Sequence, residues 1–234
     1  MHYYKELYVY RNKKPKKAVI RTYLENDFEG LIGIQKESFP PPFPSELWWN
    51  KEQLESHIQL FPEGAICIEI DGVICASITN LIVDLHNKNN HTWEDITSEG
   101  YIKNHDEYGN SLYVVDICVS PKYRALGLGK LLLQAAYEIV VNKKLENLVA
   151  GCRIPGYSKV SHLYTPEQYM NRVASGKEYD AVMTFFMKSG SIPTEVAHNY
   201  LEDEESQNCA VIMEWRNPFH TTKEKSKRPL VELV

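Results

Sequence analysis

Short apolar runs alternate with polar, turn-forming segments along most of the chain, and this pattern favours a mixed α/β fold. The clearest unit is a hairpin, in which residues 64–70 and 73–81 read as strands and Asp71-Gly72 reads as the tight turn between them. Residues 112–119 form an apolar run typical of a buried strand. Further strands are predicted at 18–23, 148–152, 195–201 and 209–216.

Capping and breaking residues separate helical segments from these strands. Asn26 and Asp27 can cap a helix that runs to about Ser38, where the proline-rich segment 40–44 stops it. Further helices are predicted at 51–60, 129–142, 166–175 and 181–188. We therefore expect one α/β (α+β) domain at 18–218 with an inserted loop at about 85–110, a loose N-terminal lead-in at 1–17 and a charged C-terminal tail at 219–234.

The amino-acid composition says little about the fold but excludes some classes of function. The 234 residues are 43% hydrophobic and 24% charged, an ordinary globular balance that can form a sizeable core. A net charge of −5 gives no basic footprint for nucleic acid and is compatible with a cationic amine substrate. No stretch approaches the ~20 apolar residues of a membrane span, and the N-terminus shows no apolar signal segment. We expect a cytoplasmic protein that binds neither nucleic acid nor membrane.

Cysteine and histidine usage predicts no metal site. The five cysteines are widely spaced and include no CxxC pair, which indicates reduced thiols in a cytoplasmic protein. His91, Glu94 and His105 match no metal-ligand spacing, so they are interpreted as loop residues.

The segment that carries chemistry is residues 119–133, Val-Ser-Pro-Lys-Tyr-Arg-Ala-Leu-Gly-Leu-Gly-Lys-Leu-Leu-Leu. An apolar strand ends, a turn with proline follows, and Arg-x-x-Gly-x-Gly opens an amphipathic helix. The first turn of a helix has unpaired N–H groups at the positive end of its dipole. Glycines let the backbone approach a phosphate without an intervening Cβ. The segment therefore predicts a diphosphate site held mainly by backbone amides.

Two other phosphate-binding motifs fail on the same residues. A P-loop needs glycine where Arg124 stands and Ser or Thr where Leu131 stands. A dinucleotide-binding fingerprint needs a third glycine where Leu132 stands. The remaining alternative is a simple turn between strand and helix.

The segment resembles the acetyl-CoA-binding motif of the GNAT superfamily, Val-x-Pro-x-x-Arg-x-x-Gly-x-Gly, and matches it from Val119 to Gly129. The predicted order of strands and helices is also similar to the GNAT order. Five short segments resemble a narrower group, the GNAT domain found fused to carbon–nitrogen hydrolases. These segments are 91–93, 104–106, 151–157, 179–180 and 214–218. The resemblance spans residues 18–218, and we do not expect the hydrolase domain itself in this chain.

The resemblance implies a GNAT fold, with a mixed central sheet splayed at the acetyl-CoA site and flanked by helices. It implies an enzyme that moves an acetyl group from acetyl-CoA, as co-substrate, to a primary amine by direct attack, without a metal. The alternative is a non-catalytic acyl-CoA-binding sensor or docking module. Expected partners are a small-molecule or protein amine acceptor and a carbon–nitrogen hydrolase, and the strand edges allow a homodimer.

The resemblance also assigns cofactor residues. The main chain of the strand end would bind the pantetheine arm and polarise the thioester carbonyl, and the following loop would hold the pyrophosphate. The strand residues are Ile117, Cys118 and Val119, and the loop residues are Arg124, Ala125, Leu126, Gly127, Leu128, Gly129 and Lys130.

Asp116 is the leading catalytic candidate, because a carboxylate in an apolar strand costs several kcal/mol to bury unless it is paired or useful. It would deprotonate the amine; the alternative is a structural ion pair. Tyr113 is a second catalytic candidate, with a packed aromatic as its alternative. Phe186 stands where the resemblance leads us to expect a tyrosine that acts as the general acid. Arg153 and Tyr157 are candidates for substrate binding; Arg153 could instead hold a backbone carbonyl.

Overall fold

The computed structural model describes residues 3–86 and 91–220. The strands in this part are β1 (Tyr4–Arg11), β2 (Lys14–Thr22), β3 (Ala65–Ile70), β4 (Val73–Val83), β5 (Ser111–Val119), β6 (Asn147–Arg153), β7 (Ile192–Ala197) and β8 (Ala210–Arg216). They form one sheet of eight strands in the order β1-β2-β3-β4-β5-β6-β8-β7. Neighbouring strands are antiparallel except β5 and β6, which are parallel.

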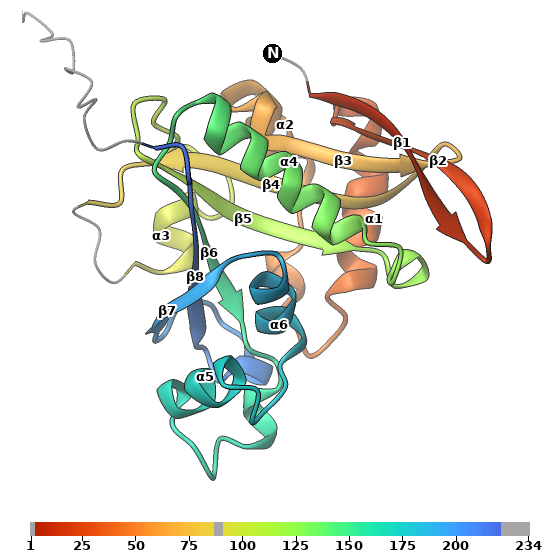
Figure 1. The fold of residues 1–234 in the computed structure, drawn as a ribbon. Coiled ribbons are helices and arrows are strands. Elements are labelled where there is room, and N and C mark those ends of the chain that lie inside the picture. Colours follow the sequence, from red (N-terminus) through yellow and green to blue (C-terminus); the bar gives the residue numbers. More distant parts are fainter. Residues whose placement is uncertain (1–2, 87–90, 221–234) are drawn as a thin grey trace, which may run out of the picture.

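Helices flank the sheet and confirm the predicted fold class. They are α1 (Phe28–Ser38), α2 (Lys51–Leu60), α3 (Trp93–Thr97), α4 (Leu128–Asn142), α5 (Pro166–Ala174) and α6 (Ala181–Lys188). Figure 1 shows α4 crossing one face of the sheet, whereas α1 and α2 lie behind the opposite face. No helix in the described part of the chain is long and apolar enough to cross a membrane.

Local capping fixes several helix boundaries where the sequence predicts them. Asn50 accepts a hydrogen bond from the Gln53 N–H, and the Gln53 side chain accepts one from the Asn50 N–H, so α2 begins at residue 51. The buried Asp180 accepts hydrogen bonds from the N–H groups of Val182 and Met183 and starts α6 in the same way.

The N-terminal segment corrects our expectation of a loose lead-in at 1–17. Strand β1 pairs along its whole length with β2, which begins at Lys14. Asn12 and Lys13 make the turn with φ of 51° and 63°. Val9 is buried while Tyr8 and Tyr10 are exposed. An edge strand needs only a few apolar residues on one face, and the many charged residues hide this pattern in the sequence.

One strand ends earlier than predicted, and the inserted loop contains a short helix. The strand expected at 195–201 is β7, which ends at Ala197 because the chain turns at Asn199 with φ of 51°. The inserted loop at 85–110 contains the short helix α3. The predicted C-terminal tail, 219–234, lies outside the described residues beyond His220.

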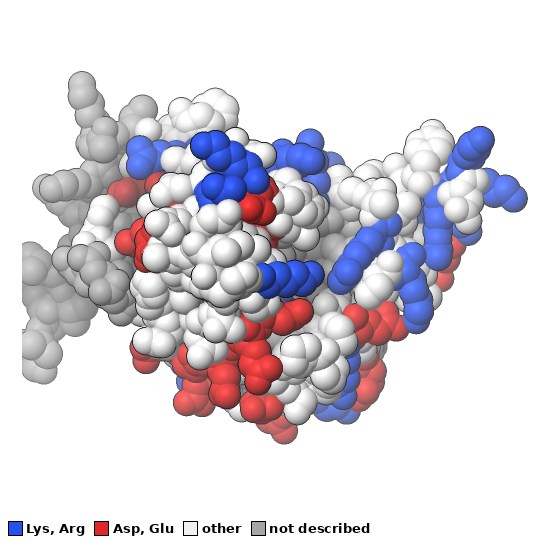
Figure 2. Space-filling model, turned by 90° about the horizontal axis from the view of Figure 1, so that it is seen from below, with Lys and Arg blue, Asp and Glu red and all other residues white. Residues whose placement is uncertain are grey.

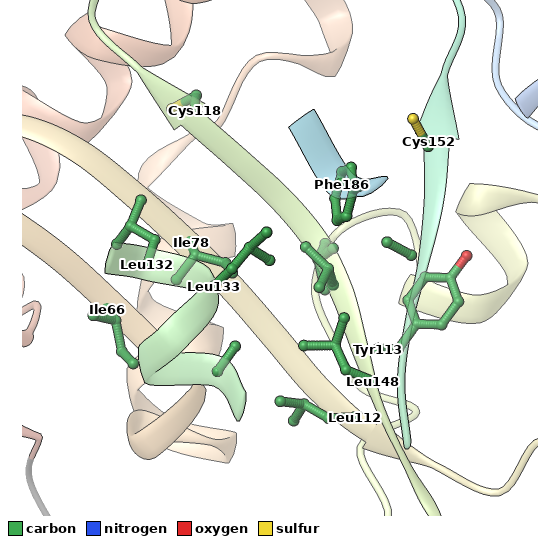
Figure 3. Packing of buried hydrophobic residues seen from close by; sticks show 14 of the residues in the cluster. Ile66, Ile78, Leu112, Tyr113, Cys118, Leu132, Leu133, Leu148, Cys152 and Phe186 are labelled. Carbon is green, nitrogen blue, oxygen red and sulfur yellow. The ribbon is translucent and has the colours of Figure 1, made fainter. Parts of the chain in front are cut away.

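The core between α4 and the sheet holds the centre of the molecule together. Leu132 and Leu133 of α4 point onto β3, β4, β5 and β6, as Figure 3 shows. Their sheet partners, which are also fully buried, are Ile66, Ile78, Leu112 and Leu148. This packing fixes the start of α4 against the end of β5, where the glycine-containing loop lies.

Candidate functional site

Strands β5 and β6 separate halfway along their length. They pair from Ser111–Asn147 to Val114–Ala150, and no pairing between them continues in the described part of the chain. Both strands run on, β5 to Val119 and β6 to Arg153. Figure 3 shows the labelled Phe186 of α6 between the diverging strands. The second half of β5 therefore has one open edge, on which main-chain groups can bind a ligand.

A bulge in β5 brings two candidate side chains to one face. Thr79 pairs with Asp116 and Asn80 pairs with Val114, which leaves Val115 as the extra residue. Tyr113 and Asp116 would point to opposite faces of a regular strand, and the extra residue places them on the same face. The Trp93 indole N–H donates to the Val115 carbonyl over 2.9 Å, so the bulge is held from α3.

The hydrogen-bond pattern of β5 decides which main-chain groups are free. The Ser120 N–H donates to the Cys75 carbonyl, on the β4 side. The main-chain N–H and C=O groups of successive residues point to alternate sides of a strand, so those of Cys118 also face β4, whereas those of Ile117 and Val119 point away from β4 toward the open edge. The Val119 carbonyl already accepts a hydrogen bond from the Ser38 hydroxyl at 3.1 Å, which leaves its N–H group for a ligand. Pantetheine binding by Ile117, Cys118 and Val119 remains a prediction, and the main chain of Cys118 is the one of the three that is turned toward β4.

The loop from Arg124 to Lys130 forms the start of α4. Ala125 and Gly127 have φ of 65° and 77°, and the Leu131 N–H is the first to bond back, to the Gly127 carbonyl at 3.1 Å. Within the described residues, no N–H between 124 and 130 finds a protein acceptor. Adjacent unpaired N–H groups at the positive end of a 15-residue helix form a site for an anion.

One basic side chain of the β1–β2 hairpin, Arg11, lies beside the residues that precede this loop. Arg11 lies 4.5 Å over the Tyr123 ring and donates a hydrogen bond of 3.4 Å to the Lys122 carbonyl. Figure 2 shows lysine and arginine gathered at the hairpin end of the molecule and acidic side chains gathered elsewhere on the same view. Arg11 therefore adds positive charge next to the loop, and it comes from the segment that we expected to be a loose lead-in.

Asp116 is the unusual ionisable group at the open edge. Its Oδ2 atom is buried and has no hydrogen-bond partner within the described residues. Burial raises the pKa of Asp116 to about 7, and hydrogen bonding by the side chains of Cys118 and Gln35 opposes that rise. No ion pair to Asp116 occurs in the described part of the chain, so the structural alternative of an ion pair has no support there.

A buried polar chain on the same face was not predicted. His57 on α2 donates its Nε2–H to the Gly100 carbonyl at 2.6 Å, because a carbonyl can only accept. Its Nδ1 then accepts from the Tyr23 hydroxyl at 2.9 Å, whose oxygen accepts from Thr79 at 3.0 Å. Thr79 is the register partner of Asp116. His57 follows Leu54 at a spacing of three on the buried helix face, the one sequence signal that could have indicated it.

Tyr113 lies deep in the molecule, away from solvent. It is fully buried, and its hydroxyl lies 2.6 Å from that of Tyr200 and 3.2 Å from Nε2 of His91. Burial raises the pKa of Tyr113. Gly151 makes room for this pair, since a Cβ there would lie 2.1 Å from the Tyr200 ring. These contacts match the alternative of a packed aromatic, and a catalytic role for Tyr113 remains a prediction.

The two predicted substrate-binding residues also have partners within the protein. Arg153 donates two hydrogen bonds to Asp203, at 2.8 and 2.7 Å, and a third to Glu205 at 3.1 Å. The Tyr157 hydroxyl donates to the Tyr164 carbonyl at 3.0 Å. Substrate binding by either remains a prediction, and neither presents its full hydrogen-bonding capacity to a ligand.

Comparison with known proteins places this geometry in a family. The profile of the Acetyltransferase (GNAT) family matches residues 28–165, which include the open edge of β5 and the loop before α4. A relative from Bacillus subtilis (strain 168), "Uncharacterized N-acetyltransferase YkwB", is 49% identical over 217 residues, which are 92% of this chain and 96% of that protein. The chain belongs to the GNAT acetyltransferase family. It is therefore an acyltransferase.

Two further similarities concern the domain and the fold. The GNAT chain is 36% identical over 204 residues to "Probable hydrolase YhcX" of the same bacterium, which is 86% of this chain but 39% of that longer protein. The solved structure "GphF GNAT-like decarboxylase in complex with isobutyryl-CoA" superposes with a TM-score of 0.69. At 19% identity, covering 85% of this chain and 98% of that one, this second likeness shows the fold alone.

An acidic cavity opens next to the bulge of this GNAT enzyme. Its volume is about 310 Å³, and it is lined by Glu46, Leu47, Asn50, Gln53, Trp93, Glu94, Glu99 and Tyr101. None of the three glutamates forms an ion pair with a described residue. Trp93 belongs both to this cavity and to the hydrogen bond that holds Val115. A larger cavity of about 660 Å³ lies against α5 and α6, away from Asp116, and is open to solvent.

The three residues considered as metal ligands do not converge on one point: Glu94 lines the acidic cavity, and the two histidines have other contacts. His105 accepts a hydrogen bond from the Ile82 N–H at 3.0 Å and stacks on Phe61, and His91 contacts Tyr113. Among the described residues, no group of three or more His, Cys, Asp or Glu side chains is placed to hold a metal ion.

Proposed function

We propose that this GNAT enzyme transfers an acetyl group from acetyl-CoA to a primary amine by direct attack of the amine on the thioester. The observation that carries the proposal is the run of unpaired N–H groups from 124 to 130, which directly follows the open edge of β5. The loop would bind the pyrophosphate, and Arg124 and Lys130 would add positive charge. The isobutyryl-CoA in the GphF complex supports a CoA thioester as the ligand of this fold.

The open edge would hold the pantetheine arm and the thioester. Ile117 and Val119 present main-chain groups there, and their N–H groups would stabilise the oxyanion that develops as the amine attacks. The free amine must lose a proton before or during attack. Asp116 would take that proton, because a carboxylate with a pKa near 7 is a stronger base than an exposed one and is still partly ionised at neutral pH.

The leaving thiolate needs no protein acid in this proposal. Phe186 is buried beside the diverging strands and carries no proton to donate. A free thiol has a pKa of about 8.5, so CoA can depart as the thiolate and take its proton from water.

The acidic cavity supports a cationic acceptor. Three carboxylates without ion-pair partners among the described residues would attract an ammonium group, and the Trp93 and Tyr101 rings would cover its aliphatic carbons. A small molecule with a second cationic group, or a lysine side chain of a protein, has this chemistry. Neither membrane nor nucleic acid is part of the proposal.

The organisation of the protein is proposed on the same grounds. We propose that residues 18–218 form one GNAT domain, to which β1 adds an edge strand, and that the protein works in the cytoplasm. The likeness to "Probable hydrolase YhcX" supports a hydrolase as a partner of this domain, and the resemblance found in the sequence makes that partner a carbon–nitrogen hydrolase. The alternative function is that of a non-catalytic acyl-CoA-binding sensor or docking module. A homodimer remains a prediction from the strand edges.

The test is calorimetric binding of acetyl-CoA and CoA together with thiol release against a panel of monoamines, polyamines and lysine peptides. Binding with turnover on an amine is the expected result. Binding without turnover on any amine of the panel would favour the sensor or docking alternative. Absence of binding to either CoA compound would overturn both.

A further inference from the structure

A second cluster of reactive groups lies beyond β6 from the open edge, where β7 ends and β8 begins. The Cys209 Sγ atom lies 3.7 Å from Nδ1 of His198, and the His198 Nε2 atom lies 2.7 Å from a carboxylate oxygen of Glu167. The three residues come from separate elements: the residue before β8, the residue after β7 and the first turn of α5. A thiol, an imidazole and a carboxylate are thus in contact in that order.

The protonation of this cluster follows from its contacts. Hydrogen bonding by its own backbone N–H, by Thr165 and by His198 lowers the pKa of Glu167, so that it is an ionised acceptor. In the neutral imidazole the His198 Nε2 atom therefore carries the proton, and the Nδ1 lone pair faces the sulfur. The thiol also has the Gln207 carbonyl as an acceptor, at 3.3 Å. Burial, and then the charge of Glu167, raise the pKa of Cys209, so the thiol keeps its proton at neutral pH until a base removes it.

Cys209 differs from the other cysteines in this respect. The thiols of Cys67, Cys75, Cys118 and Cys152 are buried, and none of them contacts a histidine in the described residues. Cys209 is 8% exposed and lies beside a His198 side chain that is 55% exposed. Solvent, and an electrophile dissolved in it, can therefore reach the imidazole that faces this sulfur.

We propose that Cys209, His198 and Glu167 form a nucleophilic thiol site, separate from the acetyl-transfer site, that accepts an acyl group from an activated carbonyl compound of the ester or thioester class. This order of groups is the arrangement that activates nucleophiles for acyl transfer. His198 takes the thiol proton as the sulfur attacks the carbonyl carbon. The bond from that carbon to the leaving oxygen or sulfur breaks, and the leaving group takes the proton from His198, so the product is an S-acyl cysteine.

The test is the rate of acetylation of Cys209, followed by mass spectrometry of the intact protein and of its peptides. One arm uses acetyl-CoA and a second uses p-nitrophenyl acetate, which distinguishes a thioester source from a small ester. Removal of the label by neutral hydroxylamine identifies a thioester. We expect label on Cys209, loss of about 100-fold in rate in His198→Ala, as for removal of a general base, and recovery of rate when free imidazole is added. Imidazole rescue would not occur if His198 only supported the fold.

The control is His86→Ala, because His86 is also exposed and also pairs with a glutamate, at 3.4 Å, but contacts no thiol in the described residues. In His86→Ala, Cys209 should be acetylated as fast as in the native protein. Cys209→Ser should carry no acetyl group at position 209. Label on Cys209 from the ester alone would support the site and assign it to small esters. Label on the other cysteines at the same rate, a His198→Ala rate equal to that of the native protein, or no label in either arm would overturn the proposal. CoA binding by Cys209→Ser should be unchanged. The labelling of Cys209 can therefore be judged separately from the proposed acetyl transfer to an amine.

Discussion

At the residue scale, Asp116 has the environment expected of a base rather than of a structural carboxylate. One of its oxygens is buried without a partner among the described residues, and burial raises its pKa from the ordinary 3.8 to about 7. The charged form is therefore disfavoured in the folded protein but not in the unfolded chain. The stability that depends on this group is greatest below about pH 4 and is lost as the pH rises to about 7.

Replacing Asp116 by asparagine should remove the base and keep the shape. We expect kcat/KM of the native enzyme to rise with pH through about 7, as Asp116 ionises, and we expect the variant to lose this rise and about 100-fold in rate at pH 8. Steady-state kinetics across pH measure both. Asp71→Asn, in the exposed β3–β4 turn, is the matched control. A normal pH profile in Asp116→Asn would remove Asp116 from the mechanism.

The same variant should be more stable than the native protein at high pH. A rise of about 3 units corresponds to a penalty of about 2–4 kcal/mol for ionised Asp116 in the folded state. Denaturant unfolding should show Asp116→Asn more stable by about that amount at pH 8 and equal to the native protein at pH 4. Equal stabilities at both pH values would mean that the carboxylate is well solvated.

The sequence could predict these residues only where the chemistry is local. The loop 124–130 follows from adjacent residues, and Asp116 is conspicuous as a carboxylate within an apolar run. Arg153 looked available for a substrate because its partner Asp203 is 50 residues away. His57 escaped notice because only the folded chain brings Gly100 and Tyr23 to its two nitrogens.

At the element scale, the start of α4 depends on backbone conformation as well as on free N–H groups. Gly127 has φ of 77°, and no atom lies within 4 Å of the position that a Cβ would take, so alanine there would be strained by conformation alone. Residues other than glycine lose about 1–2 kcal/mol in this region. The loop should relax away from the arrangement that binds an anion.

Calorimetry of CoA binding to Gly127→Ala and Gly33→Ala tests this expectation. Gly33, in α1, also has open space around a Cβ but has an ordinary helical conformation. We expect about 10-fold weaker binding in Gly127→Ala, and unchanged binding with slightly higher stability in Gly33→Ala. Equal binding by the two variants would show that the loop tolerates another conformation.

The bounds of a helix or strand could be predicted where residues close to its ends in the sequence determine them. The capping pair of α2 lies within four residues, and the predicted bounds match the observed ones. Strand β1 was missed because its evidence is its pairing with β2 and one buried residue, Val9. The bulge at Val115 was equally hidden, because only the register with β4 reveals an extra residue.

At the scale of the whole molecule, the buried chain through His57 joins α2, the inserted loop and the sheet. Burial lowers the pKa of His57 to about 4 from 6.5, so the neutral form is favoured in the folded protein. For such a group, the stability is fully present above about pH 6.5 and is lost as the pH falls toward 4.

Acid unfolding should therefore begin at this junction. We expect a loss of about 3 kcal/mol in the free energy of unfolding between pH 6.5 and pH 4, and we expect His57→Gln to lack this loss. Both the native protein and His57→Gln should carry Asp116→Asn in this comparison. The contribution of Asp116 to stability has the opposite dependence on pH in this range and would mask the effect of His57. His162→Gln, at an exposed histidine, serves as the control. If the free energy of unfolding of His57→Gln falls with pH as much as that of the native protein, the acid-sensitive group lies elsewhere.

The separation of β5 from β6 means that the sheet is interrupted at its centre until something bridges the two strands. Bound acetyl-CoA would supply that bridge and act as part of the architecture during each catalytic cycle. Amide hydrogen exchange should slow at Ile117 and Val119 when CoA is added and stay unchanged at Leu112, where β5 and β6 are already paired. The protein would then be stiffest while it holds its co-substrate and loosest just after release, so each turnover would include a change in its rigidity.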